Sequence, residues 1–343
     1  MNTADVLLRL SETDGPSGFE DRVAKEITKL LAPLTDEVAR DVMGNVIGVR
    51  RCGRPNARRL LLDAHIDEIG FIVTGYDNGF VRFSVIGGVD ARMLPARAIR
   101  FLTEPPVRGV IMTLPPHILE EADSDKPFAM DALFVDVGMT DEEVRAALPR
   151  GTAAVYDAGA VRLNENVICG KALDDRSCFA VILDALERLR GEDLPVDVYV
   201  MASTQEEVGV RGATAGAFAV DPDYAVILDV GHGKTPDASG TGLLEFGGGC
   251  GVAVGPNMNR KYTDRILRAA EEKGIPHQIE VIPTGSSGTN ARAVQISREG
   301  VATALLSLPL KYMHSPSEMV HLADMDACAR LLCEAVRAAG EVD

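Results

Sequence analysis

Apolar and polar residues alternate along the chain in two different patterns, and each pattern predicts a different kind of structure. Near the N-terminus, apolar positions from Phe19 to Leu31 recur at helical intervals, and Ser17 to Glu20 has capping-box spacing before them. Residues 41–50 predict two strands around a glycine-centred turn, and the apolar run 59–64 predicts a buried strand that ends at His65. The chain therefore begins as an α/β unit.

The pattern changes after Gly70. Short alternating runs separated by glycine-containing turns predict a small β-barrel or sandwich, and Thr140 and Glu143 have capping-box spacing at the start of one short helix. Strand–helix alternation resumes only after this stretch. We therefore predict one domain formed by residues 1–71 and 161–343, with residues 72–160 inserted into it as a β-rich domain.

The second half of the chain alternates strands with helices. The predicted strands are 167–169, 195–202, 224–228, 278–282 and 301–308, and the predicted helices are 177–189, 259–273 and a segment after the 285–288 loop. Near-continuous apolar strands joined through helices are typical of parallel sheets that are covered on both faces. The predicted fold class is therefore α/β, with a mostly parallel sheet, flanking helices and an inserted small β-barrel domain.

Charged and imidazole side chains follow several of these predicted strands. His65, Glu206-Glu207, Asp229 and His314 come after apolar runs, and Asp174-Asp175 separates the strand at 167–169 from the next helix. Each has an ordinary interpretation, because an isolated His is usually a hydrogen-bonded structural residue and an Asp at this position can cap a helix. Their joint occurrence at the carboxyl edge of one sheet, where α/β proteins form their sites, predicts a shared site.

Two imidazoles and three carboxylates suit a pair of divalent metal ions. Each ion needs about three protein ligands, which this set provides if one carboxylate, proposed to be that of Asp174, bridges both ions. Glu206 and Glu207 are neighbours whose side chains point in opposite directions in an extended segment, so both cannot bind one ion in the same manner. We expect one of them to be a ligand and the other a general base.

The charge balance narrows the classes of partner. The chain has 51 acidic and 35 basic residues, and its net charge of −16 argues against binding to nucleic acid or to an anionic membrane surface. No apolar run approaches the roughly 20 residues of a membrane span, and the first ten residues do not resemble a signal peptide, so we expect a cytoplasmic protein. The six cysteines include no CxxC pair, which favours reduced thiols over a disulfide framework or a zinc ribbon.

The motifs that contain these residues resemble those of metallopeptidase family 42, the dinuclear tetrahedral aminopeptidases that are also named glucanase M-type proteins. They are AHIDEIG at 64–70, GKALDDR at 170–176, QEEVG at 205–209, ILDV at 227–230 and YMHSPSE at 312–318. The resemblance covers nearly the whole chain in the family's order. It implies a zinc-peptidase-like catalytic domain formed by residues 1–71 and 161–343, dimerisation through the 72–160 insert, and dimers that build a hollow tetrahedral dodecamer.

The resemblance also implies a role for each site residue. His65 and Asp229 would hold one metal ion, Glu207 and His314 the other, and Asp174 would bridge the two. Glu206 would be the general base, and Asp67 would orient the ring of His65. The implied cofactors are two divalent ions per subunit, Zn²⁺ or Co²⁺, and the implied backbone at Asp174-Asp175 is strained, with a cis peptide bond.

We therefore expect a metal-dependent aminopeptidase that acts on short peptides. Three other functions stay open: a related dinuclear carboxypeptidase or deacylase, an endoglucanase, and a non-enzymatic peptide- or metal-binding module. The endoglucanase fits poorly, because the chain has no Trp and glycosidase carboxyls flank a sugar ring about 5–9.5 Å apart, whereas Glu206 and Glu207 are adjacent. Two residues depart from the family pattern: Asn290, where the family usually has Asp, and His232, an additional imidazole.

Overall fold

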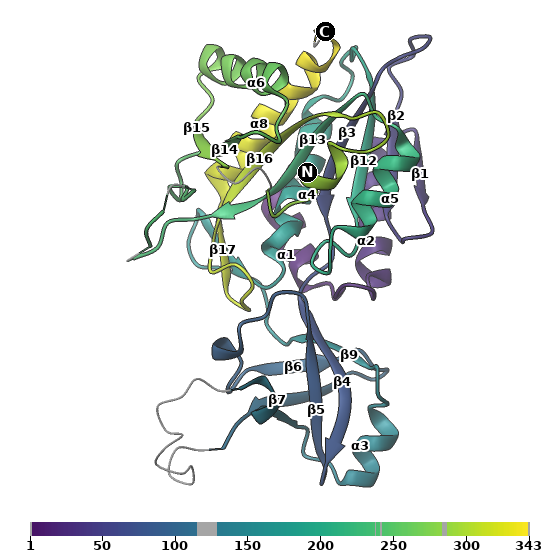
Figure 1. The fold of residues 1–343 in the computed structure, drawn as a ribbon, viewed down its shortest axis with the longest axis vertical. Coiled ribbons are helices and arrows are strands. Elements are labelled where there is room, and N and C mark those ends of the chain that lie inside the picture. Colours follow the sequence, from purple (N-terminus) through teal and green to yellow (C-terminus); the bar gives the residue numbers. More distant parts are fainter. Residues whose placement is uncertain (1, 115–128, 237, 241, 283–286, 342–343) are drawn as a thin grey trace.

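The computed structural model describes residues 2–114, 129–236, 238–240, 242–282 and 287–341. A large sheet with helices on both faces forms one part of the molecule, and a separate β-barrel extends from it (Figure 1). Among the described helices, none is long and apolar enough to cross a membrane.

In the described part of the chain, eleven strands form the large sheet, in the order β1-β2-β12-β3-β13-β16-β17-β11-β10, and β14 and β15 extend from β16. Their bounds are β1 Glu37–Arg40, β2 Val46–Arg50, β3 Arg59–His65, β10 Val161–Arg162, β11 Val167–Gly170, β12 Asp197–Ser203, β13 Tyr224–His232, β14 Cys250–Val254, β15 His277–Val281, β16 Ala302–Lys311 and β17 Glu318–His321. The central strands β12, β3, β13 and β16 are parallel neighbours, and strands toward both ends pair antiparallel. With the barrel, this sheet confirms the predicted fold class.

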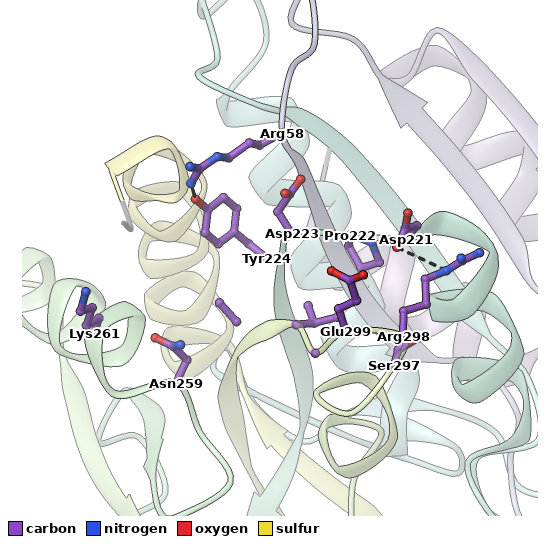
Figure 2. A pocket seen from close by; sticks show the side chains of 13 residues that line it. Arg58, Asp221, Pro222, Asp223, Tyr224, Asn259, Lys261, Ser297, Arg298 and Glu299 are labelled. Atoms are coloured by element: carbon purple, nitrogen blue, oxygen red, sulfur yellow. Dashed lines mark hydrogen bonds and ion pairs between the residues drawn. The ribbon is translucent and has the colours of Figure 1, made fainter.

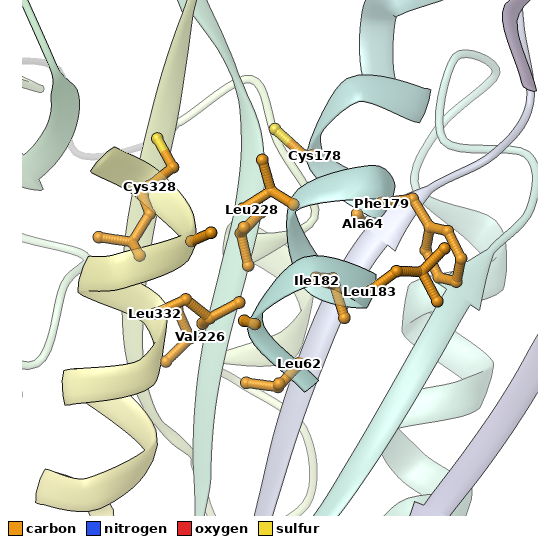
Figure 3. Packing of buried hydrophobic residues seen from close by; sticks show 14 of the residues in the cluster. Leu62, Ala64, Cys178, Phe179, Ile182, Leu183, Val226, Leu228, Cys328 and Leu332 are labelled. Atoms are coloured by element: carbon orange, nitrogen blue, oxygen red, sulfur yellow. The ribbon is translucent and has the colours of Figure 1, made fainter. Parts of the chain in front are cut away.

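Helices cover the two faces of the sheet unequally. The larger core lies under α1 Thr3–Glu12, α2 Asp21–Leu31, α4 Leu173–Arg188, α6 Arg260–Lys273 and α8 Leu322–Ala338. Figure 3 shows Ile182 of α4 and Leu332 of α8 packed among Leu62 and Val226 of the strands. Full burial of one such side chain contributes about 1.5–3 kcal/mol to folding. The smaller core lies under α5 Arg211–Val220 and α7 Ala291–Val294.

Alternation along the central strands decides which face receives the polar residues. Leu61, Ile227 and Leu305 belong to the smaller core, under α5 and α7. Side chains two or four positions further along a strand point to the same face, so His65, Asp229 and Ser307 also leave the sheet there. The side chains in between, such as Leu62 and Leu228, belong to the larger core on the opposite face.

The barrel is closed in the order β4-β5-β8-β7-β6-β9. Its strands are β4 Gly70–Asp77, β5 Phe80–Ile86, β6 Ala98–Phe101, β7 Val107–Met112, β8 Phe134–Asp136 and β9 Ala153–Tyr156, and α3 Asp141–Ala147 packs beside them. Phe71 contacts Phe83 and Tyr156 edge to face at the centre of its apolar interior. The predicted capping box is confirmed, because Thr140 and Glu143 bond reciprocally at the start of α3.

The other predicted capping box, at Ser17 to Glu20, is wrong. Helix α2 begins at Asp21, its N-cap Glu20 makes no side-chain capping bond, and the Ser17 hydroxyl donates instead to Asp67. Phe19, expected on the buried face of this helix, precedes it and is 42% exposed. The tertiary contact with Asp67 therefore replaces the local cap that the sequence predicted.

Candidate active site

The predicted site residues converge at the carboxyl ends of the central strands. His65 ends β3, Asp229 lies in β13, Glu206 and Glu207 follow β12, and His314 follows β16. Ligand atoms of His65, Asp174 and Glu207 lie within 4.8 Å of one another, and so do those of His65, Asp175 and Asp229. The fold thus brings the residues predicted from the sequence to one place.

Asp174 lies between the two imidazoles. Its Oδ1 is 2.9 Å from His65 Nε2, and its Oδ2 is 3.4 Å from His314 Nε2. Glu207 Oε1 is 3.2 Å from the same nitrogen of His314. The peptide bond from Asp174 to Asp175 is cis, which confirms the backbone expected from the resemblance. Asp174 makes no side-chain cap for α4, so the ordinary interpretation as a helix cap does not describe it.

The sequence predicts for Asp175 only a possible helix-capping role, but the structure places it in the cluster. It is fully buried, and its carboxylate lies with His65 and Asp229 in the second of the two groups. The donor set that could hold metal is therefore made of two imidazoles and several carboxylates, which suits borderline and hard divalent cations.

Asp67 contacts three residues of this cluster and holds them in position. The Nδ1 of His65 lies 3.1 Å from the backbone carbonyl of Asp67 and 3.4 Å from its carboxylate. The same carboxylate accepts the backbone N–H groups of Glu206 at 3.0 Å and Glu207 at 3.2 Å, and the hydroxyl of Ser17 at 2.6 Å. One buried acid therefore positions the His65 ring and the two adjacent glutamates together.

A buried ion network joins the segments that carry His65 and Asp174. The Nζ of Lys171 lies 2.9 and 2.7 Å from the two oxygens of Glu68, and Arg176 Nη2 lies 3.2 Å from the first of them. Arg176 also donates through Nε to the carbonyl of Ile66 at 3.1 Å. Loss of one member of such a buried group leaves an uncompensated charge, which costs about 3–5 kcal/mol.

The pKa values of the cluster shift in opposite directions. Burial lowers the pKa of His314, but the neighbouring carboxylates of Asp174 and Glu207 outweigh burial and raise it to about 11. Burial raises the pKa of Glu206 to about 7, and the negative charges of Glu207 and Asp67 add to this rise. The pKa of Asp229 is likewise raised well above its ordinary range, chiefly by burial. Such closely packed, perturbed groups are typical of functional sites.

Glu318 lies at the end of the 312–318 motif, and the sequence alone predicts no role for it. It is buried, and its Oε2 accepts the backbone N–H groups of Leu173 at 2.8 Å and Asp174 at 3.2 Å, while its Oε1 accepts that of His314 at 2.8 Å. Its position four residues after His314 was the only signal in the sequence. The tertiary structure makes Glu318 the link between the segments of Asp174 and His314.

Asn290 is not exposed to the cleft. It is buried, and its amide group donates to Asp63 Oδ2 at 2.8 Å and to Ser203 Oγ at 2.9 Å. Burial raises the pKa of Asp63 to about 7. The Asn290 amide therefore anchors the start of α7 to β3 and β12. His232, by contrast, is exposed and lines the cleft.

The cluster opens into a cleft of about 650 Å³, whose walls include Glu280, Ile282, Leu305 and Met313. Figure 2 shows a different pocket, of about 840 Å³, at the amino ends of β13 and β16. Among its charged groups, Arg298 pairs with Asp221 at 3.3 Å. The strand-end cleft is the candidate active site, because only that cleft contains the His and carboxylate cluster.

Comparisons with known proteins agree with this geometry. The family model of the M42 glutamyl aminopeptidases matches residues 44–331. The lysyl aminopeptidase of Pyrococcus furiosus is 36% identical over 333 residues, covering 95% of this chain and 94% of that protein. An aminopeptidase from the archaeon Desulfurococcus kamchatkensis has a TM-score of 0.91 at 33% identity, covering 98% of this chain and 95% of its own. The Pyrococcus horikoshii TET1 peptidase, described as assembling into a tetrahedron or a large octahedral shell, has a TM-score of 0.86 at 29% identity, covering 98% and 99%.

Proposed function

Because this chain belongs to the M42 family of aminopeptidases and is a metal-dependent peptide-bond hydrolase, we propose that its strand-end cluster binds two divalent ions and removes N-terminal residues from short peptides. The observation that carries this proposal is the position of Asp174, with one oxygen toward His65 and the other toward His314. A carboxylate with two separately directed oxygens is suited to bridge two ions.

The residues divide between the two ions as follows. His65 and Asp229 would hold one, Glu207 and His314 the other, and Asp174 would bind both. Borderline nitrogen and carboxylate donors favour Zn²⁺ or Co²⁺. When bound, such ions supply Lewis-acid polarisation of the scissile carbonyl and of the attacking water.

Glu206 is the proposed general base. It accepts the proton of the attacking water and passes it to the leaving amine. Asp67 keeps Glu206 and Glu207 in place through their backbone N–H groups. Asp67 thereby fixes the backbone from which the side chains of the proposed base and of the proposed ligand extend.

The test compares the two adjacent glutamates. Glu206→Gln should lower kcat about 10²–10⁴-fold while the metal content stays unchanged, because it removes only the proton acceptor. Glu207→Gln should lower the metal content, and its activity should recover partly in excess metal. Near-wild-type kcat in metal-replete Glu206→Gln would falsify this assignment. A parallel assay with free and N-acetylated peptides separates an aminopeptidase, which needs the free amine, from a carboxypeptidase or deacylase.

We also propose that residues 72–160 act as an inserted dimerisation domain and that the protein is a homo-oligomer. The outward positions of β7 support this, because Val110 and Met112 are each 40% exposed and Leu114, just beyond, is 49% exposed. Exposed apolar residues close together are typical of protein interfaces. Because the similar TET1 peptidase can assemble into a tetrahedron, the tetrahedral dodecamer that the family resemblance implies is the form to test first. Light scattering that finds a monomer at working concentration would contradict the proposal.

A further inference from the structure

One carboxylate of the cleft has no place in the proposed metal cluster. Glu280 lies on β15, which β16 and β14 separate from the strand of Asp229, and it lines the same cleft. Its Oε2 accepts the hydroxyl of Ser307. Ser307 is the β16 residue directly paired with Asp229 of β13. The acid of β15 is therefore held against the strand pair that carries a proposed metal ligand.

The position of Gly231 locates this carboxylate further. A β-carbon at Gly231 would lie 3.4 Å from Glu280 Oε1 and 3.2 Å from Ser307 Cβ. Gly231 is two residues beyond Asp229, so both positions face the same side of the sheet, about 6.6 Å apart along the strand. Glu280 Oε1 thus lies near Gly231, in a space that it shares with Leu244, whose Cδ1 would be 2.7 Å from the same β-carbon.

The same cleft also has apolar side chains. Leu305 is buried two positions before Ser307 on the same face, and Ile282 and Met313 also line the cleft. A substrate side chain that extends from the metal cluster into this cleft would therefore have both aliphatic groups and the Glu280 carboxylate available as contacts. This combination suits a side chain with a hydrocarbon stem and a cationic end, as in lysine and arginine.

We propose that Glu280 is a specificity-determining residue that selects peptides with an N-terminal lysine or arginine. This inference rests on the proposed aminopeptidase function and adds the substrate class. The competing charge in the cleft is Arg292 of α7, which would favour acidic side chains. It is exposed, whereas Glu280 is half-buried beside Ser307, so the Glu280 charge is less screened by solvent.

The experiment measures kcat/KM of the metal-loaded enzyme for the p-nitroanilides of lysine, arginine, norleucine and glutamate. Norleucine has the lysine stem without the charge. The wild type should prefer lysine to norleucine at least about tenfold. Glu280→Gln, which can still accept from Ser307, should lower kcat/KM for lysine and arginine about 10- to 100-fold, because a hydrogen bond to a charged group is lost. It should leave norleucine within about twofold.

The matched control is Arg292→Gln, which removes the positive charge of the arginine and should preserve the preference for lysine. Equal losses for lysine and norleucine in Glu280→Gln would overturn the proposal, since they would mean that Glu280 contacts the α-amine common to all substrates. A wild-type preference for glutamate that disappears in Arg292→Gln would overturn it as well. If the wild type hydrolyses none of the four compounds, the aminopeptidase function itself fails, and that result is distinct from a loss of selectivity.

Discussion

Replacing Glu318 by Gln should weaken both the fold and the metal site, and the structure allows the size of the effect to be worked out. The carboxylate accepts three backbone N–H groups, two of them through Oε2 and that of His314 through Oε1. An amide has one oxygen. If that oxygen stays with the two N–H groups of Leu173 and Asp174, the amide NH₂ must face the N–H of His314.

Two costs follow from that arrangement. One hydrogen bond to a charged acceptor is lost, which costs about 1.5–3 kcal/mol, and a buried donor is left unsatisfied, which costs about 1–3 kcal/mol. We therefore expect Glu318→Gln to lower the free energy of unfolding of the metal-free protein by about 2.5–6 kcal/mol. Because His314 would no longer be tied to Asp174, metal affinity should fall about 10- to 100-fold, as it does when supporting residues of metal sites are changed.

Urea unfolding of the metal-free protein measures the first effect, and isothermal calorimetry with Zn²⁺ measures the second. The exposed neighbour Ser317 provides the control, since Ser317→Ala should change stability by no more than about 0.5 kcal/mol. Glu318→Asp keeps the charge and should recover part of the metal affinity. If Glu318→Gln binds Zn²⁺ with wild-type affinity and stoichiometry, Glu318 does not position the metal site and the reasoning is wrong.

Two further predictions concern the buried polar groups of the site. Asn290→Asp would replace the amide that donates to Asp63 at 2.8 Å by a second carboxylate. The unpaired buried charge should lower the free energy of unfolding at pH 8 by about 3–5 kcal/mol. One of the two acids then has a folded-state pKa raised above its unfolded value. The loss of unfolding free energy should therefore be absent below about pH 4 and should grow as pH rises through the folded-state pKa. Wild-type Asp63, whose pKa is raised to about 7, should show a weaker pH dependence of stability with the same sign. The double variant Asp63→Asn/Asn290→Asp exchanges donor and acceptor and should restore most of the stability, whereas purely additive losses in urea unfolding would refute a direct pairing. Chelation of the metal should lower the melting temperature, because the acids that surround Asp174 then repel one another. Zn²⁺ or Co²⁺ at about 100 times Kd should restore about 2.7 kcal/mol of unfolding free energy per site. A melting temperature that neither chelation nor added metal changes would contradict a bound metal pair.

The order of apolar and polar residues was enough to predict the elements and the site residues that follow them. Strand β3 was predicted to end at His65, and the run at 224–228 was predicted to lead to Asp229. These predictions succeed because buried parallel strands need near-continuous apolar residues, so polar residues at their carboxyl ends stand out. The barrel was predictable for a related reason, since its short alternating strands and turns differ from the pattern before Gly70 and after residue 160.

Contacts between distant segments were decided only by the tertiary structure. Ser17 has local capping spacing, yet its hydroxyl bonds to Asp67, fifty positions away, because the strand end lies beside that loop. Glu318 and Asn290 look like ordinary polar residues in the sequence, and their importance comes from the backbone N–H groups and the buried Asp63 that surround them. Glu280 enters the cleft because β15 joins the sheet through β14 beside β16. Periodicity reports which face of an element is buried, whereas a hydrogen bond depends on which element lies opposite, and that is settled when the whole sheet assembles.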